Sequence, residues 1–119
     1  MSSGLHVDFE SLDFERVIAH GGCAEIQFKR VVDGDREGAY NFLDMSVVPP
    51  GAEIGRHEHS ADNEELYIVI TGRGRMQLDA QEFDVGPGHV IINRPGGIHG
   101  LRNIGDTDLR LVVIEVPTR

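Results

Sequence analysis

The chain has 119 residues, of which 20 are acidic and 11 are basic, so its formal net charge at pH 7 is −9. This length fits a single domain over residues 1–119. An acidic chain with no basic run longer than Lys29–Arg30 is repelled by phosphate backbones and anionic lipids, so we expect no nucleic acid and no membrane as partner. The first residues lack the basic and apolar segments of a signal peptide, and we therefore expect a cytoplasmic location.

Short runs rich in Val, Ile, Leu, Phe and Thr alternate with turns that contain Gly or Pro. Eight such runs predict strands: Cys23–Val32, Tyr40–Val48, Glu64–Thr71, Gly74–Asp79, Glu82–Val85, His89–Asn93, His99–Asn103 and Asp108–Val116. Only Ser11–Ala19 could form a helix, and its alternating pattern fits an edge strand equally well. Many short strands between evenly spaced turns are typical of an all-β sandwich or barrel.

Two histidines, His57 and His59, are separated by one residue. On an extended strand their side chains leave the same face, with the Cα atoms about 7 Å apart. Their nitrogens can then reach one metal ion at roughly 2.0–2.2 Å. Such a pair arises often by chance, so two exposed polar residues are an equally good interpretation of the pair alone. An acidic pair, Glu64-Glu65, on the next predicted strand and His99 at a later glycine turn favour a metal site.

These residues resemble the two motifs of the cupin superfamily. The first motif, G-x5-H-x-H-x3,4-E-x6-G, is matched by Gly51, His57, His59, Glu65 and Gly72. The second motif, G-x5-P-x-G-x2-H-x3-N, is matched by Gly88, Gly96, His99 and Asn103, although Arg94 stands in place of the proline. The resemblance implies a double-stranded β-helix, the cupin jelly-roll barrel, with its core at about residues 40–116.

The resemblance also implies a ligand set of His57, His59, Glu65 and His99 around one divalent transition metal: Fe, Mn, Ni, Cu or Zn. Four protein ligands on an octahedral ion leave two neighbouring positions for water, substrate or dioxygen. Glu64 fits the distance from His59 and stays the alternative acidic ligand, whereas Glu65 fits the distance to the glycine that ends the strand.

The implied function is a metal-dependent enzyme that acts on a small oxygenated or carboxylated metabolite. Its reaction would be that of an oxidoreductase such as a dioxygenase, or of a lyase, isomerase or decarboxylase. The alternative is a non-catalytic module that binds a metal or a small ligand. Small cupins commonly pair, so a homodimer is expected, and no organic cofactor is indicated.

Five further residues carry weaker predictions. Tyr67 shares a strand face with Glu65 and could offer its phenol to a substrate, or it could be a half-buried strand aromatic. Asn103 is predicted to stabilise a turn, and Cys23 to be a small buried residue without a disulfide. His20 has no identifiable role, and His89, which follows a turn glycine, is expected to be exposed.

Overall fold

A computed structural model describes residues 4–32 and 36–119 of the chain. In this part of the chain the strands are β1 (Glu15–Val17), β2 (Ile26–Val32), β3 (Phe42–Val48), β4 (Glu53–Glu58), β5 (Asn63–Thr71), β6 (Gly74–Leu78), β7 (Gln81–Val85), β8 (Val90–Asn93), β9 (Ile98–Asn103) and β10 (Leu109–Pro117). Two 3₁₀ turns, η1 (Phe9–Ser11) and η2 (Ala19–Gly21), lie on either side of β1 in the sequence. No helix in the described ranges is long and apolar enough to cross a membrane.

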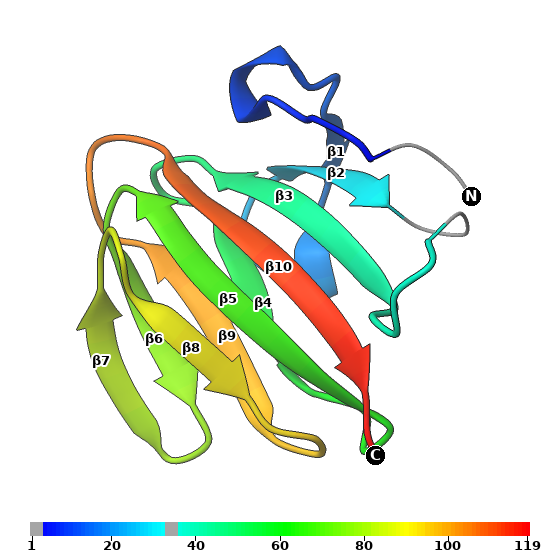
Figure 1. Cartoon of the computed structure of the whole chain (residues 1–119). Helices are drawn as coiled ribbons and strands as arrows, with labels where there is room; N and C mark the ends of the chain where they lie inside the picture. The colour runs from blue at the N-terminus through cyan, green and yellow to red at the C-terminus, as the bar shows by residue number, and fades with distance from the viewer. Residues whose placement is uncertain (1–3, 33–35) are drawn as a thin grey trace.

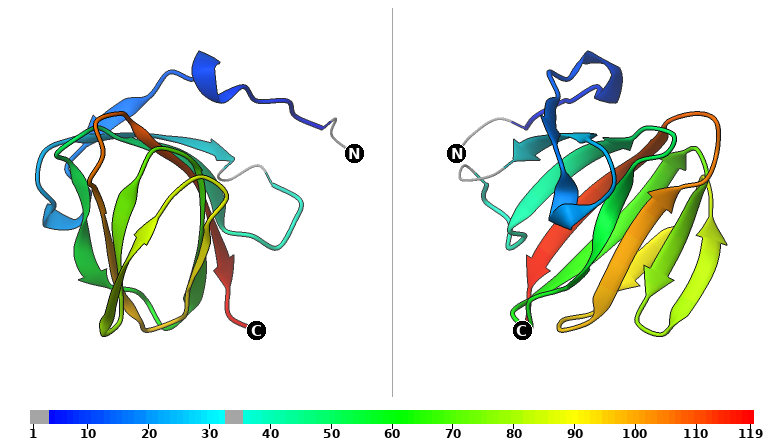
Figure 2. Two further views of the ribbon diagram at one scale, coloured as in Figure 1. Left: turned by 90° about the vertical axis from the view of Figure 1, so that its left-hand side faces the viewer. Right: turned by 180° about the vertical axis from the view of Figure 1, so that it is seen from behind.

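The strands form two antiparallel sheets that face each other (Figure 1). One sheet has the order β1-β2-β3-β10-β5-β8, and the other has the order β4-β9-β6-β7. The end-on view in Figure 2 shows the two sheets curving around a shared interior. The expected all-β jelly-roll barrel is therefore confirmed.

The interior changes from apolar to polar along the length of the strands. Successive strand residues point to opposite faces, so every second residue of β10 and β5 faces the interior. Three of the paired positions on that face are Leu111 with Val69, Val113 with Tyr67, and Glu115 with Glu65. The apolar end is closely packed, with Val48, Met76, Leu101 and Leu109 all buried. Burial at this end stabilises the barrel and leaves the other end free to carry polar groups.

All eight predicted strands are confirmed, with ends that differ by up to three residues. One strand was missed: in the region of β4 the sequence analysis identified only a histidine pair between glycines. Its residues Gly55, Arg56 and Glu58 hide the apolar alternation that marks a strand. Within Ser11–Ala19 the chain forms the short strand β1, so the edge-strand interpretation is confirmed and the helix is not.

The prediction for Cys23 is wrong, because its side chain is exposed. The chain there is held by its backbone: the Cys23 amide donates to the Glu53 carboxylate at 2.9 Å, and its carbonyl accepts from the Glu53 amide at 3.2 Å. The prediction for Asn103 is confirmed. Its side-chain amide donates to the carbonyls of Val48 and Thr107, and its side-chain oxygen accepts from Gly105.

Gly72, in the turn between β5 and β6, has a φ of 87° and lies against the start of β10. A Cβ atom there would lie 2.5 Å from the carbonyl oxygen of Asp108 and 2.7 Å from the Cα atom of Leu109. Gly88 has a similar φ of 85°, but a Cβ atom there would have no neighbour within 4 Å among residues 4–32 and 36–119. At Gly72, both the positive φ and the close approach of β10 therefore favour glycine. At Gly88, only the positive φ does.

These two glycines give a matched test of packing against backbone strain. Gly88→Ala should lower the free energy of unfolding by about 1–2 kcal/mol, the cost of a left-handed residue. Gly72→Ala should cost at least about 2 kcal/mol more, because β10 must also move away. Urea unfolding followed by circular dichroism measures both. Equal losses would show that β10 does not depend on this contact.

Candidate metal centre

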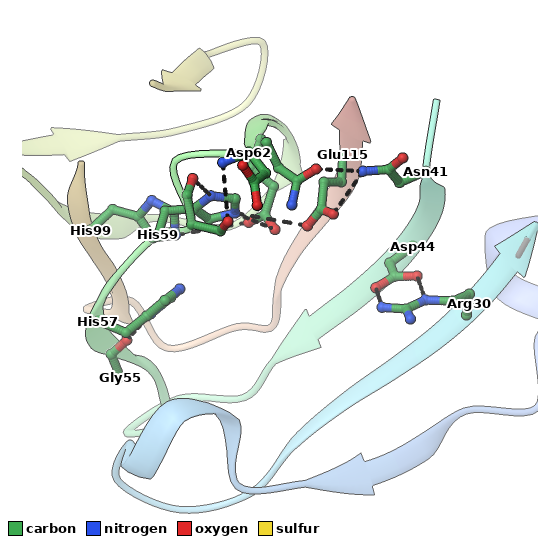
Figure 3. Close-up of polar contacts among 12 residues, drawn as sticks. Arg30, Asn41, Asp44, Gly55, His57, His59, Asp62, His99 and Glu115 are labelled. Carbon is green, nitrogen blue, oxygen red and sulfur yellow. Dashed lines mark hydrogen bonds and ion pairs between the residues drawn. The ribbon is translucent and has the colours of Figure 1, made fainter. Parts of the chain in front are cut away.

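Three histidines meet between the sheets, at the polar end of the barrel (Figure 3). His57 on β4 is the register partner of His99 on β9, and their ring centroids are 4.4 Å apart. His59 follows the end of β4, and its ring centroid lies 5.3 Å from that of His99 and 6.5 Å from that of His57. The three sequence-predicted histidines are thus brought together.

Glu65 reaches the histidines from the opposite sheet. Its Oε2 lies 3.1 Å from Nε2 of His59, and its Oε1 lies 3.8 Å from Nε2 of His99. The neighbouring Glu64 is placed elsewhere: its carboxylate accepts a hydrogen bond of 2.9 Å from the exposed guanidinium of Arg94. Of the two acidic candidates in the sequence, only Glu65 faces the histidines.

Sequence reasoning missed a second carboxylate, Glu115 on β10. It is the register partner of Glu65, and its Oε2 lies 3.8 Å from Nε2 of His59. His59, Glu65 and Glu115 together form a group whose donor atoms all lie within 4.8 Å of one another. The Glu115 carboxylate also accepts a 3.0 Å hydrogen bond from the side chain of Asn41. No motif marks Glu115; only the pairing of β10 with β5 brings it here.

Backbone carbonyls fix the orientation of two histidine rings. Nδ1 of His57 donates to the carbonyl of Gly55 at 2.7 Å, and Nδ1 of His59 donates to the carbonyl of Ser60 at 3.3 Å. A ring that donates from Nδ1 carries its lone pair on Nε2 when neutral. Both rings are therefore held in the tautomer that offers Nε2 to an ion.

Burial and neighbouring charges shift the pKa values in opposite directions. Burial lowers the pKa of His57, with the charge of His59 adding to the effect. For His59, burial favours a lower pKa, but the hydrogen bond and charge of Glu65 outweigh this effect. With smaller contributions from Ser60 and Glu115, the net result is a raised pKa of His59. Burial raises the pKa of Glu65, and the contact with His59 opposes this shift only in part. The site therefore tends to keep a proton between His59 and Glu65.

His99 is the most buried of the three histidines, with 1% of its surface exposed. Neither of its ring nitrogens has a hydrogen-bond partner among the described residues. Burial and the nearby charges of His57, His59 and His20 lower its pKa to about 3, so this ring stays neutral at ordinary pH. An unpartnered buried nitrogen costs free energy unless something else binds it, which makes His99 the clearest sign of a ligand site.

The turn η2 adds a fourth imidazole that the sequence did not identify. His20 stacks on His57 with ring centroids 3.4 Å apart and planes only 8° from parallel. This contact depends on a close backbone approach, because a Cβ atom on Gly55 would lie 2.2 Å from the carbonyl oxygen of His20. The only sequence signal for this contact is the pair of glycines that follows His20.

Of the other residues considered in the sequence, Tyr67 lies beside this group. Tyr67 is 2% exposed, and its ring centroid lies 5.5 Å from that of His99. Burial and the adjacent Glu65 raise the pKa of the Tyr67 phenol, so it stays protonated. His89 is exposed, as predicted. Arg56 is also exposed, and Arg94 pairs with Glu64 at the surface.

Comparison with known proteins identifies the family and the fold of the chain. The cupin domain family matches residues 44–115. The oxalate-binding protein of Thermotoga maritima is 26% identical over 117 residues, which covers 94% of this chain and 93% of that protein. An uncharacterised protein of Methanocaldococcus jannaschii is 33% identical over 81 residues, and the match spans 68% of this chain but only 64% of that relative. The crystal structure of a predicted oxalate decarboxylase from T. maritima superposes with a TM-score of 0.89 at 22% identity, covering 96% of this chain and all of the other.

The lowered pKa of His99 predicts a pH-dependent stability. Unfolded chains bind a proton at His99 below about pH 6.5, whereas the folded chain does so only near pH 3. As pH falls from about 6.5 to about 3, proton binding to the unfolded chain therefore lowers the free energy of unfolding, by up to about 1.4 kcal/mol per pH unit.

His99→Gln removes this titration, so the comparison isolates it from other groups. Between pH 6.5 and 4.5 the metal-free wild type should lose stability relative to this variant, as measured by urea unfolding. A stability difference that stays constant over this range would contradict a neutral, buried His99.

Proposed function

Because the chain belongs to the cupin family, we propose that His57, His59, Glu65 and His99 bind one divalent transition metal. We further propose that the protein is an enzyme that uses this ion on a small oxygenated or carboxylated molecule. The observation that carries the proposal is His99, whose two ring nitrogens are buried beside three other donor groups and have no hydrogen-bond partner in the described part of the chain.

The donor set fits such an ion. Three imidazoles and a carboxylate without a thiolate suit Fe, Mn, Ni, Cu or Zn, and four protein ligands leave two positions open on an octahedral ion. Structural zinc sites are commonly rich in cysteine thiolates, and the single cysteine of this chain, Cys23, lies exposed in the turn before β2. When bound, the ion would supply Lewis acidity or redox chemistry at the open positions.

The surrounding residues would orient the donor atoms, and metal binding would displace a proton from the site. The carbonyls of Gly55 and Ser60 hold the rings of His57 and His59 with Nε2 available. Metal binding requires a deprotonated carboxylate and neutral imidazoles, so the proton shared by His59 and Glu65 must leave the pair. Glu115, whose Oε2 lies 3.8 Å from Nε2 of His59, adds a second carboxylate beside this pair.

A second candidate function is a binding module without turnover. The relative that covers nearly the whole chain is named as an oxalate-binding protein, which favours this alternative. The two functions are separated by whether metal-loaded protein converts any small acid that it binds. Oxalate is the first compound to test.

Adjacent residues provide matched controls for the ligand set. Glu65→Gln and His99→Ala should each lower the metal retained after dialysis at least tenfold, as measured by elemental analysis, because each removes one of four ligands. Glu64→Gln and His89→Ala remove a carboxylate and an imidazole that lie outside the site. These two variants should retain the wild-type metal content. His57→Ala should lose turnover while its far-UV circular dichroism stays that of a β protein.

Two outcomes would contradict the proposal. If Glu64→Gln loses metal and Glu65→Gln does not, the ligand set is wrong. If His57→Ala unfolds, and the thermal stability of the wild type rises steeply with metal content, the ion is structural and the enzyme proposal fails.

The stacked His20 should support His57 rather than bind the ion. An imidazole nitrogen binds a metal in the plane of its ring, and the His20 plane lies about one ring thickness from that of His57. His20→Ala should weaken cobalt affinity roughly three- to tenfold, the value of one aromatic contact. His20→Phe keeps a stacking surface and should keep most of the affinity in competition with a chelator. Equal losses in both variants would instead make His20 a ligand.

A further inference from the structure

Two neighbouring hollows lie at the polar end of the barrel. The first, which we call the donor chamber, has a volume of about 300 Å³ and is lined by His57, His59, Glu65 and Glu115 among others. The second, which we call the side chamber, has a volume of about 320 Å³ and lies against the inner face of β2 and β3. The chambers share the side chains of His20, Arg30, Phe42 and Glu65, so they adjoin each other at these residues.

The side chamber is mainly apolar. Strand alternation turns Ile26 and Phe28 of β2 and Phe42 of β3 into it, and Ile54 and Val113 line it from β4 and β10. Its volume is at the lower end of the range for small-molecule pockets, roughly 300–1,000 Å³. A ring-sized apolar group fits this space, whereas a ligand no larger than oxalate would leave it unfilled.

The charges in the two chambers oppose a second carboxylate on the ligand. Arg30 is the only Arg or Lys among the described residues that line them. Its guanidinium forms two hydrogen bonds with Asp44, of 2.9 and 3.0 Å, and lies 3.9 Å from the centroid of the Phe42 ring. The Arg30–Asp44 pair is drawn in Figure 3, away from the histidines. A ligand carboxylate in the side chamber would face Asp44 and Glu65 and would have to compete for this cation.

We infer that the ligand has two oxygen donors at one end and an apolar, ring-sized body at the other. This inference rests on the proposed function, because the oxygen donors would take the open positions of the ion in the donor chamber. The body lies in the side chamber against Phe28, Phe42 and Val113. The substrate class is therefore a 2-hydroxy acid, or a comparable chelating acid, with an aromatic or alicyclic substituent, and not a bare dicarboxylate.

Three 2-hydroxy acids with the same donor atoms test this inference. Glycolate has no substituent, mandelate has a phenyl ring and malate has a second carboxylate. Each is titrated into cobalt-loaded protein, and binding is followed by the cobalt absorption spectrum and by calorimetry. Mandelate should bind at least tenfold more tightly than glycolate, which is about 1.4 kcal/mol. Malate should bind no more tightly than glycolate. The binding of each acid to cobalt ions in water, without protein, is the reference for differences between the acids themselves.

A variant that fills the side chamber sharpens the test. Ser46 lines the side chamber but not the donor chamber. Ser46→Phe should remove the advantage of mandelate and leave the affinity for glycolate and the cobalt content unchanged. The wild-type ratio decides the question by itself if this variant does not fold.

The outcomes distinguish the two proposals. If cobalt binds but mandelate is within threefold of glycolate, or if malate binds most tightly, the inference on the ligand is overturned and the metal site stands. If the protein binds no cobalt, the proposed function fails and this inference fails with it.

Discussion

The burial of His99 is the constraint on which the rest of the site depends. Each unpartnered polar group in a protein interior costs about 1–3 kcal/mol. His99 cannot avoid this cost by turning outward, because its backbone pairs with His57 on one side and with Leu78 on the other. The closely packed apolar end of the barrel offsets the cost, and its side chains keep β9 in place.

The candidate site takes its donors from both sheets. His57 and His99 lie on β4 and β9 of one sheet, whereas Glu65 and Glu115 lie on β5 and β10 of the other. Facing sheets are separated by about 10 Å, a distance that two side chains can bridge when they point toward each other. The spacing of the sheets, which the apolar core sets, therefore also sets the spacing between the imidazoles and the carboxylates.

The motifs predicted the fold and the positions where the histidines and Glu65 gather, because a motif records residues at strand ends whose spacing the barrel dictates. The strand-side spacing favoured Glu65 over Glu64, and the structure turns only Glu65 toward the histidines. Glu115 and His20 could not be found this way. Glu115 reaches the site only through the pairing of β10 with β5, and His20 through the close packing of η2 on Gly55. Such contacts between distant segments leave no local pattern in the sequence.

The order of the strands has a consequence for how the chain acquires its site during synthesis. β10 comes last among the described strands, yet it occupies the middle of its sheet, between β3 and β5. Until it inserts, those two strands each present an open edge, and Glu65 lacks its register partner Glu115 on that side. A chain emerging from the ribosome thus has its two adjacent histidines long before it has the complete donor set. The proposed ion would therefore meet only His57 and His59 early in synthesis, and the full proposed ligand set only in the finished barrel.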